Sequence, residues 1–252
     1  MTTILVTGGT GTLGRHVVER LRTDGHEVRV LSRRTPPYAV DLREGGGGLD
    51  RALDGTGTVV HCATSARGGD EQAARNLIAA ARRAGVEHLV YISIVGVDRV
   101  PFPYYRTKLA VERQIADSGT GWTVLRATQF HDLLFRLFQG LSKSPVMPLP
   151  ARVKDQPVEV REVADRLAQL AQGAPAGRAD DLGGPEVRTL HSLAHAYLAA
   201  AGRRRALVKV PLRGAAYEAF RAGGHLAPER AVGTRTFEEF LTERFAAKGG
   251  RR

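Results

Sequence analysis

The first 130 residues alternate short runs of apolar and β-branched residues with stretches in which apolar residues recur at helical spacing. The runs that we expect to form strands are TILVTG, EVRVLS, YAVDL, TVVHCAT, HLVYISIVG and WTVLRAT. Several of them are apolar at successive positions, which is typical of strands buried on both faces of a sheet. The pattern therefore predicts βαβ units and an α/β fold with a doubly wound parallel sheet.

Three stretches between these runs have the periodicity of helices of crossover length: residues 13–23, 71–84 and 104–118. A glycine follows each of them, Gly25, Gly85 and Gly119 respectively. Glycine is favoured at this position because the residue after a helix often adopts the left-handed conformation. The sequence thus predicts where each of these helices ends.

The rhythm changes after about residue 138, where SKSPVMPLP predicts a proline-marked loop. Beyond it we expect a short strand at 158–160, helices at 162–172 and 189–201, the second with Thr189 as its N-cap, and a strand at LVKVPL. We therefore expect a Rossmann domain over residues 1–138 and a smaller substrate-binding lobe over 139–252. The two are expected to pack as one globular body.

Composition narrows the class of protein. The formal charge is +11, but the arginines are scattered and only five of the 37 basic residues are lysines, so we expect a basic surface and no nucleic-acid partner. No apolar run approaches the roughly 18 residues that a membrane span needs. Cys62 is the only cysteine and the start of the chain has no signal-peptide pattern. A cytoplasmic protein without a membrane partner is expected, its oligomeric state left open.

Glycines in TGGTGTLG point to a dinucleotide site. Gly8, Gly11 and Gly14 lie between the first expected strand and the first expected helix. A tight turn there would let a pyrophosphate approach bare backbone, and the start of the helix would offer N–H groups and its positive dipole end. Thr12 and Leu13 complete the expected loop, although a turn that only packs strand on helix is the alternative.

The end of the second strand indicates which cofactor binds. Sites for NAD usually place a carboxylate there, on the ribose 2′-hydroxyl, whereas this chain has Ser32, Arg33 and Arg34. Guanidinium groups match a 2′-phosphate in charge and geometry, so we expect NADPH in preference to NADH, unless both arginines are merely solvated. Further candidates to line the adenosine and ribose are Asp41, Leu42, Ala63 and Thr64. Asp41 could instead cap a turn.

Side chains that could act on a substrate gather at the expected carboxyl edge of the sheet. Ser93 ends the fifth strand, and Tyr104 and Lys108 lie four residues apart on the next helix, on the face that also carries Val111 and Ile115. A lysine charge is expected to lower the pKa of a nearby tyrosine, which would suit Tyr104 to general acid catalysis. The alternative is a packed tyrosine beside a lysine that extends to solvent.

His131 and Asp132 follow the sixth strand, where they could orient a substrate, although a lone histidine is more often structural. Substrate specificity is expected in residues 97–103, which begin at Val97, in the proline-marked loop and in the C-terminal helices. No metal site is expected, because neither His61 with Cys62 nor the pair His191 and His195 has a third ligand at a suitable spacing.

Six stretches of this chain resemble the NmrA-like, atypical branch of the short-chain dehydrogenase/reductase family. They are TGGTGTLG, SRR, YISIVG, YYRTKLAVE, WTVLRATQF and DLGGPE, and the similarity extends from residue 1 to about residue 240. The resemblance implies a Rossmann fold that binds NADPH and a substrate pocket closed by the C-terminal part. It also implies that Ser93 polarises the substrate oxygen, Tyr104 donates the proton, and Lys108 binds the nicotinamide ribose, with Thr128, Gln129 and Phe130 beside the nicotinamide.

These features together predict an NADPH-dependent oxidoreductase that reduces a carbonyl, a quinone or a conjugated small molecule. Two alternatives stay open. The chain could be a catalytically silent protein that senses NADP(H) for a protein partner, or, less well supported, an isomerase or epimerase that uses the cofactor transiently.

Overall fold

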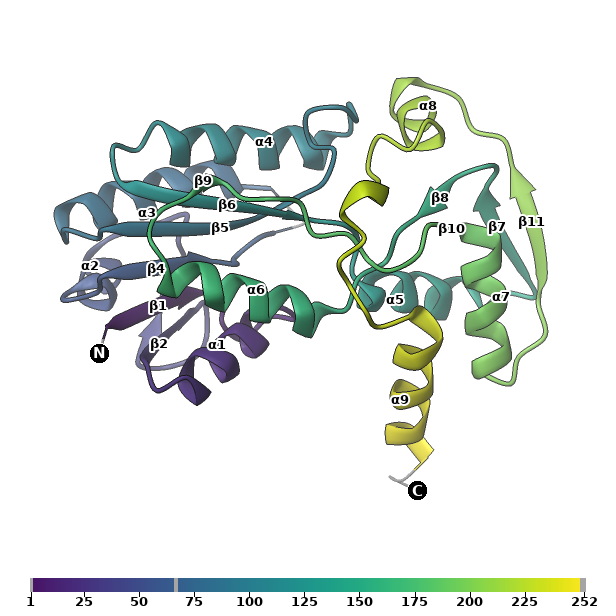
Figure 1. The fold of residues 1–252 in the computed structure, drawn as a ribbon, viewed down its shortest axis with the longest axis horizontal. Helices are drawn as coiled ribbons and strands as arrows, with labels where there is room; N and C mark the ends of the chain where they lie inside the picture. Colours follow the sequence, from purple (N-terminus) through teal and green to yellow (C-terminus); the bar gives the residue numbers. More distant parts are fainter. Residues whose placement is uncertain (1, 66–67, 250–252) are drawn as a thin grey trace. The chain divides into compact units, whose positions relative to one another are not determined.

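A seven-stranded sheet with the strand order β3-β2-β1-β4-β5-β6-β9 organises much of the chain in the computed structural model, which describes residues 2–65 and 68–249 (Figure 1). Parallel pairing joins β1 to β2 and β4, β2 to β3, β4 to β5, and β6 to β9. The strands are β1 (Thr3–Thr7), β2 (Glu27–Ser32), β3 (Tyr38–Ala39), β4 (Thr58–His61), β5 (His88–Ile94), β6 (Gly121–Ala127) and β9 (Gly177–Arg178). All six strands expected before residue 130 are present.

The strand order reverses at β1, whose neighbours are β2 on one side and β4 on the other. Val6, for example, pairs with Val30 on β2 and with Val60 on β4. In such sheets ligands bind outside the carboxyl ends of the strands at this switch point. The fold therefore directs attention to the segments that follow β1, β2 and β4.

Helices cover both faces of this sheet (Figure 1). Side chains of α2 (Gly47–Leu53), α3 (Asp70–Arg83) and α4 (Pro103–Ala116) share one buried apolar cluster with the strands. Polar contacts connect α1 (Gly14–Thr23) with α6 (Val160–Gln172), including a hydrogen bond of 3.0 Å from Gln172 to Asp24. The three glycines expected after helices do have positive φ, at +86° for Gly25, +71° for Gly85 and +73° for Gly119.

The chain forms two compact units, and it passes between them several times. The first unit is Met1–Ser93, Pro103–Arg126 and Arg161–Asp180, and the second is Ile94–Phe102, Ala127–Val160 and Asp181–Arg252. The expected division into 1–138 and 139–252 has a single boundary, whereas each unit of the structure is built from three separate segments of the chain. The reason is that α6 and β9, far along the sequence, add a helix and an edge strand to the sheet of the first unit.

The second unit has its own aromatic core. Helices α5 (His131–Leu141), α7 (Leu190–Ala200) and α9 (Phe237–Gly249) supply most of it, with Met147 and Leu149 from β7 (Val146–Pro150). Strand β7 pairs in parallel with β11 (Ala206–Val210), and β8 (Lys154–Asp155) pairs antiparallel with β10 (Arg188–Thr189). Helix α8 (Ala215–Arg221) and a 3-10 turn, Pro228–Arg230, complete the unit.

Two expectations for this unit are wrong. The proline-marked segment contains strand β7, because β7 has β11 as its one strand neighbour and prolines are tolerated at a sheet edge. Residues 158–160 do not form a strand: Val158 makes an isolated bridge with Phe130, and Val160 already begins α6. The N-cap Thr189 is confirmed, since its hydroxyl accepts a hydrogen bond of 3.0 Å from the backbone N–H of Ser192. In the described part of the chain, no helix has both the length and the hydropathy to cross a bilayer.

Candidate dinucleotide and proton-transfer site

Two of the three motif glycines are required by close backbone packing. Gly8 has a φ of +65°, and a Cβ atom there would lie 2.8 Å from the backbone nitrogen and Cα of Ala63. A Cβ on Gly14 would lie 2.3 Å from the carbonyl oxygen of Gly8. At these two positions, packing of the strand against the helix is therefore sufficient to explain the glycine.

Gly11 is different, because a Cβ there would make one close contact in place of several. A Cβ there would meet only the carbonyl oxygen of Gly8, at 3.1 Å, among the atoms that the structure describes within 4 Å. The helix behind it begins without a side-chain cap at Leu13 and without an acidic residue in its first turn. A helix start with these properties attracts an anion. The residues present thus fit a pyrophosphate beside Gly11.

Arg33 and Arg34 lie exposed on a turn that Ser32 organises. The buried Ser32 hydroxyl accepts hydrogen bonds from the backbone N–H groups of Thr35, at 3.0 Å, and Arg34, at 3.4 Å. The charge of Arg33 helps to lower the pKa of Asp41. Two exposed cations after β2 fit the 2′-phosphate of NADPH.

Asp41 is held in its own turn. Arg43 donates a backbone hydrogen bond of 3.0 Å and a guanidinium hydrogen bond of 2.5 Å to the Asp41 carboxylate. These hydrogen bonds lower the pKa of Asp41 to about 2. The contacts favour the turn-capping interpretation of Asp41, and the side chain of Leu42 packs in the core of the first unit.

The segment after β4 connects the glycine loop with Tyr104. Ala63 packs against Gly8 and donates a backbone hydrogen bond of 3.3 Å to the Thr7 hydroxyl. The next residue, Thr64, has its hydroxyl 2.9 Å from the hydroxyl of Tyr104. The structure thus shows Thr64 bound to the candidate proton donor, and its expected contact with the cofactor stays a prediction.

Tyr104 is partly buried and belongs to a short polar chain. The Thr64 hydroxyl donates a hydrogen bond of 2.5 Å to Asp70, whose other carboxylate oxygen accepts one of 2.8 Å from the Ser65 backbone N–H. Burial raises the pKa of Tyr104 above its ordinary value, the hydrogen bond with Thr64 lowers it, and the charge of Asp70 raises it. A tyrosine in this environment keeps its proton at neutral pH, as a general acid must.

Lys108 does not act on Tyr104 as expected. Its Nζ atom donates a hydrogen bond of 2.9 Å to the carbonyl oxygen of Ile92 and lies 4.5 Å from the centre of the Tyr91 ring. Burial lowers the pKa of Lys108 to about 8, against the opposite effect of Asp70. The expectation that Lys108 lowers the pKa of Tyr104 is wrong, because burial raises this pKa more than any other influence on the tyrosine. Its contact with the ribose stays a prediction.

Ser93 offers a buried hydroxyl at the end of β5. It is 2% exposed, and its Oγ atom has no hydrogen-bond partner within the described part of the chain. Ser93 follows Tyr91 by two residues, so the two side chains lie on the same face of the sheet. Tyr91 contacts Lys108 of α4, so this is the face that α4 covers. An unpartnered buried hydroxyl is costly unless a ligand uses it, which keeps Ser93 a candidate.

The residues expected beside the nicotinamide lie in the second unit. The hydroxyl of Thr128 accepts a hydrogen bond of 3.1 Å from the backbone N–H of Gly184, and Gln129 accepts one of 2.8 Å from Val158 at its backbone oxygen. Phe130 forms the bridge with Val158. The nicotinamide contacts of these residues stay predictions, as does the substrate contact of Val97, whose side chain is buried.

His131 and Asp132 begin α5 and have structural surroundings. Nε2 of His131 lies 3.0 Å from the Arg235 carbonyl oxygen, and its ring packs against Phe237 and Phe240 with centroid distances of 5.6 and 5.3 Å. Asp132 is a buried acid in the first turn of α5, where it complements the helix dipole. These surroundings favour the structural interpretation of both residues.

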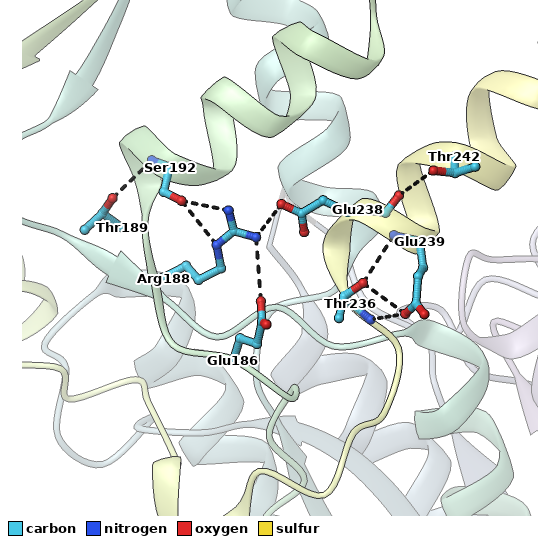
Figure 2. Close-up of polar contacts among 8 residues, drawn as sticks. All are labelled: Glu186, Arg188, Thr189, Ser192, Thr236, Glu238, Glu239 and Thr242. Carbon is cyan, nitrogen blue, oxygen red and sulfur yellow. Dashed lines mark hydrogen bonds and ion pairs between the residues drawn. The ribbon is translucent and has the colours of Figure 1, made fainter.

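A surface hollow of about 600 Å³ in the second unit is lined by Glu186, Val187, Arg188, Thr236 and Glu238. Figure 2 shows that Arg188 points at Glu238, at 2.5 Å, and at Glu186, at 3.6 Å. The starts of α7 and α9 beside it are capped by Thr189 and Thr236. The guanidinium of Arg188 and the backbone N–H groups capped at both helix starts therefore already have partners. These contacts connect α9 with β10, and the hollow offers no ligand chemistry of its own.

Asp70 is the residue that the sequence interpretation missed. An acid directly before an expected helix usually serves as a cap, and the spacing of Thr64, Asp70 and Tyr104 carries no known motif. A second hidden contact lies deeper, where the Thr7 hydroxyl is 2.7 Å from Nδ1 of His61. Within residues 2–65 and 68–249, no group of three or more histidine, cysteine or acidic side chains is arranged to hold a metal ion.

Comparisons with known proteins agree with this geometry. Residues 8–172 match the model of a family described as NAD(P)H-binding. The (4-alkanoyl-5-oxo-2,5-dihydrofuran-3-yl)methyl phosphate reductase of Streptomyces griseus is 33% identical over 201 residues, which cover 74% of this chain and 69% of that protein. Quinone oxidoreductase 2 of Escherichia coli is 32% identical over 135 residues, which cover 49% of this chain and 47% of that protein.

Solved structures show the same fold. An NADPH-dependent quinone oxidoreductase from Escherichia coli, complexed with NADPH, aligns with a TM-score of 0.83 at 20% identity, covering 96% of this chain and 99% of that chain. A UDP-N-acetylglucosamine 4-epimerase from Bacillus cereus aligns with a TM-score of 0.74 at 20% identity, covering 100% and 98%. The predicted Rossmann fold and the family resemblance are confirmed.

Proposed function

Because this chain belongs to the NAD(P)H-binding family, we propose that it is an oxidoreductase of the short-chain dehydrogenase/reductase type that uses NADPH to reduce a small molecule. The substrate class is a carbonyl compound, a quinone or a conjugated enone. The reductase from Streptomyces griseus and the quinone oxidoreductase from Escherichia coli support a reduction. The exposed Arg33 and Arg34, in place of a carboxylate, support NADPH.

One observation carries this proposal: consecutive residues after β4 contact both the glycine loop and the candidate acid. Ala63 packs on Gly8, and Thr64 bonds Tyr104. A single turn of chain therefore holds a proton donor close to the loop that fits a pyrophosphate. A redox enzyme needs a cofactor and a proton donor at the same sheet edge, whereas a protein that only senses the cofactor has no use for the donor.

Several residues of the first unit are suited to hold the cofactor. The backbone around Gly11 and the start of α1 would bind the pyrophosphate, and Arg33 the 2′-phosphate. Lys108 would bind the nicotinamide ribose with hydrogens that Ile92 does not use, since an ammonium has three to donate. When bound, NADPH supplies the hydride.

The protein supplies orientation and a proton. Ser93 donates its free hydroxyl hydrogen to the substrate oxygen and polarises it, because its Oγ atom has no partner in the described residues. Tyr104 donates the proton to the same oxygen as negative charge develops there. Its raised pKa ensures that the donor is loaded at neutral pH.

Two measurements test the proposal together. Calorimetric titrations with NADPH and NADH should show tighter binding of NADPH, and a screen of quinones, ketones and enones should find acceptors that make the protein oxidise NADPH. Binding without oxidation by any acceptor would instead indicate a cofactor sensor. In that case the oxidised and reduced cofactors should alter the affinity for a partner differently.

A further inference from the structure

Three side chains from separate elements of the first unit form a continuous hydrogen-bonded chain. Tyr104 is on α4, Thr64 follows β4, and Asp70 is the first residue of α3. The Tyr104 and Thr64 hydroxyls are 2.9 Å apart, and Thr64 Oγ1 is 2.5 Å from an Asp70 oxygen. Asp70 is 6% exposed. A buried carboxylate thus reaches the candidate proton donor through one intervening hydroxyl.

The chemistry of the groups fixes the direction of these hydrogen bonds. An ionised carboxylate only accepts, so the one hydroxyl hydrogen of Thr64 goes to Asp70. Thr64 must then accept at its other contact, and the hydrogen of Tyr104 points at Thr64. The Tyr104 hydrogen is therefore held by the Thr64 oxygen until another acceptor takes it.

The Asp70 carboxylate is itself fixed, because the backbone N–H of Ser65 lies 2.8 Å from its second oxygen. The orientation of the Thr64 hydroxyl, and through it the position of the Tyr104 hydroxyl, therefore depends on Asp70.

We propose that Asp70, acting through Thr64, is a positioning residue that holds the Tyr104 hydroxyl in place for proton donation. This inference rests on the proposed reductase activity. In each turnover Tyr104 gives its proton to the substrate oxygen and is reprotonated by one proton from solvent. The hydride comes from NADPH, so that each reduction consumes one proton and one hydride.

The pair of variants Thr64→Val and Thr64→Ser isolates the intervening hydroxyl, since valine removes it and serine keeps it. Asp70→Asn keeps the size of the side chain and removes its charge. We expect Thr64→Val and Asp70→Asn to lower kcat about 10-fold or more. KM should stay within about twofold of the parent in both variants, because neither residue is assigned to substrate binding. NADPH affinity should stay within about twofold in Asp70→Asn, because Asp70 is not assigned to cofactor binding. Thr64→Ser should stay near parental activity.

A spectroscopic titration tests the coupling without turnover. The phenol of Tyr104 is followed by ultraviolet absorbance, with Tyr104→Phe subtracted. Removing the charge of Asp70 should lower the pKa of Tyr104, whereas removing the Thr64 hydroxyl should raise it, because these two influences have opposite signs. Circular dichroism and urea unfolding establish that each variant is folded.

The outcomes separate this inference from the proposed function. Opposite shifts of the Tyr104 pKa, with kcat lost and KM retained, support the positioning role of Asp70. An unmoved Tyr104 titration in both variants, or parental kcat in Asp70→Asn, overturns it. A parent that oxidises no NADPH with any acceptor contradicts the reductase proposal, and the titration then decides alone whether Asp70 controls the Tyr104 proton.

Discussion

The backbone of Ala63 lies so close to Gly8 that a Cβ on the glycine would sit 2.8 Å from the Ala63 nitrogen and Cα. This approach joins the ends of β1 and β4 at the point where the strand order reverses. Thr64 follows Ala63 directly and contacts Tyr104, and α1 begins six residues after Gly8. The contact explains why a glycine-rich turn serves the fold as well as a ligand.

Substitutions of Gly14 and Gly11 should have different effects on stability and on NADPH binding. Gly14→Ala should destabilise the protein by about 1 to 3 kcal/mol or more, on the scale of overpacked cores, because its Cβ would lie 2.3 Å from the Gly8 carbonyl oxygen. Gly11→Val should leave stability near that of the parent and abolish NADPH binding, since its side chain would fill the space beside the helix start. Gly11 does not have a positive φ, so the loss would come from blocking and not from backbone strain. Urea unfolding and calorimetric titration of both variants check this, and normal NADPH binding by Gly11→Val would show that the loop only packs.

Arg33→Ala should weaken NADPH binding by about 1.5 to 3 kcal/mol, the scale of a hydrogen bond to a charged group, and leave NADH binding unchanged. The matched control is Arg22→Ala, which removes an exposed arginine from the last turn of α1 and alters the net charge equally. Calorimetric titrations with both cofactors measure the effect. Equal affinities of the parent for NADPH and NADH would refute the assignment.

Asp155 should make stability fall as the pH rises from about 4 to about 7. Burial raises the pKa of this carboxyl from 3.8 to about 7, so in this window the folded chain holds a proton that the unfolded chain has lost. Since the folded state binds more protons, raising the pH favours unfolding, by roughly 4 kcal/mol at most over the window.

Urea unfolding of Asp155→Asn across the same pH range checks this expectation, because the variant should lose that part of the pH dependence. Asp117→Asn, which changes an exposed aspartate, should behave as the parent does. Identical pH dependence in parent and Asp155→Asn would mean that the buried carboxyl does not titrate as described.

Lys108 should make stability rise, and not fall, as the pH increases above about 8. Burial lowers its pKa from 10.5 to about 8, so between these values the unfolded chain binds the extra proton. Raising the pH through that window should therefore stabilise the parent relative to Lys108→Met, by roughly 3 kcal/mol. The difference in unfolding free energy between the two proteins, followed from pH 8 to pH 10.5, measures this directly. A constant difference would contradict the buried position of the ammonium.

Much of the first unit could be predicted from the sequence because its signals are local. Runs such as TVVH are buried on both faces of a parallel sheet, and Gly25, Gly85 and Gly119 mark the ends of helices. Because the carboxyl ends of parallel strands lie at the same edge of a sheet, the sequence also predicted that Thr64 and Tyr104 lie in the same region. Asp70 could not be identified, because its role depends on a contact with Thr64 across a loop, and a lone acid before a helix has a simpler explanation.

The second unit was harder for physical reasons. Strand β7 contains Pro148 and Pro150, which argue against a strand unless the partner is known, and β11 follows it only after α7. The helix at α5 did carry a signal, with buried Leu134, Phe135 and Phe138 on one face. From the sequence, His131 and Asp132 are candidate substrate contacts after the sixth strand, and no helix is expected there.

The central claim is that Tyr104 donates a proton beside a bound NADPH, and steady-state NADPH oxidation by the parent and Tyr104→Phe tests it most directly. Phenylalanine preserves the packing of the ring and removes the donor. The account predicts that NADPH affinity is retained while turnover falls by about 100-fold to 10,000-fold, the range for general acid catalysis. Full activity in Tyr104→Phe would contradict it and remove the tyrosine from the mechanism.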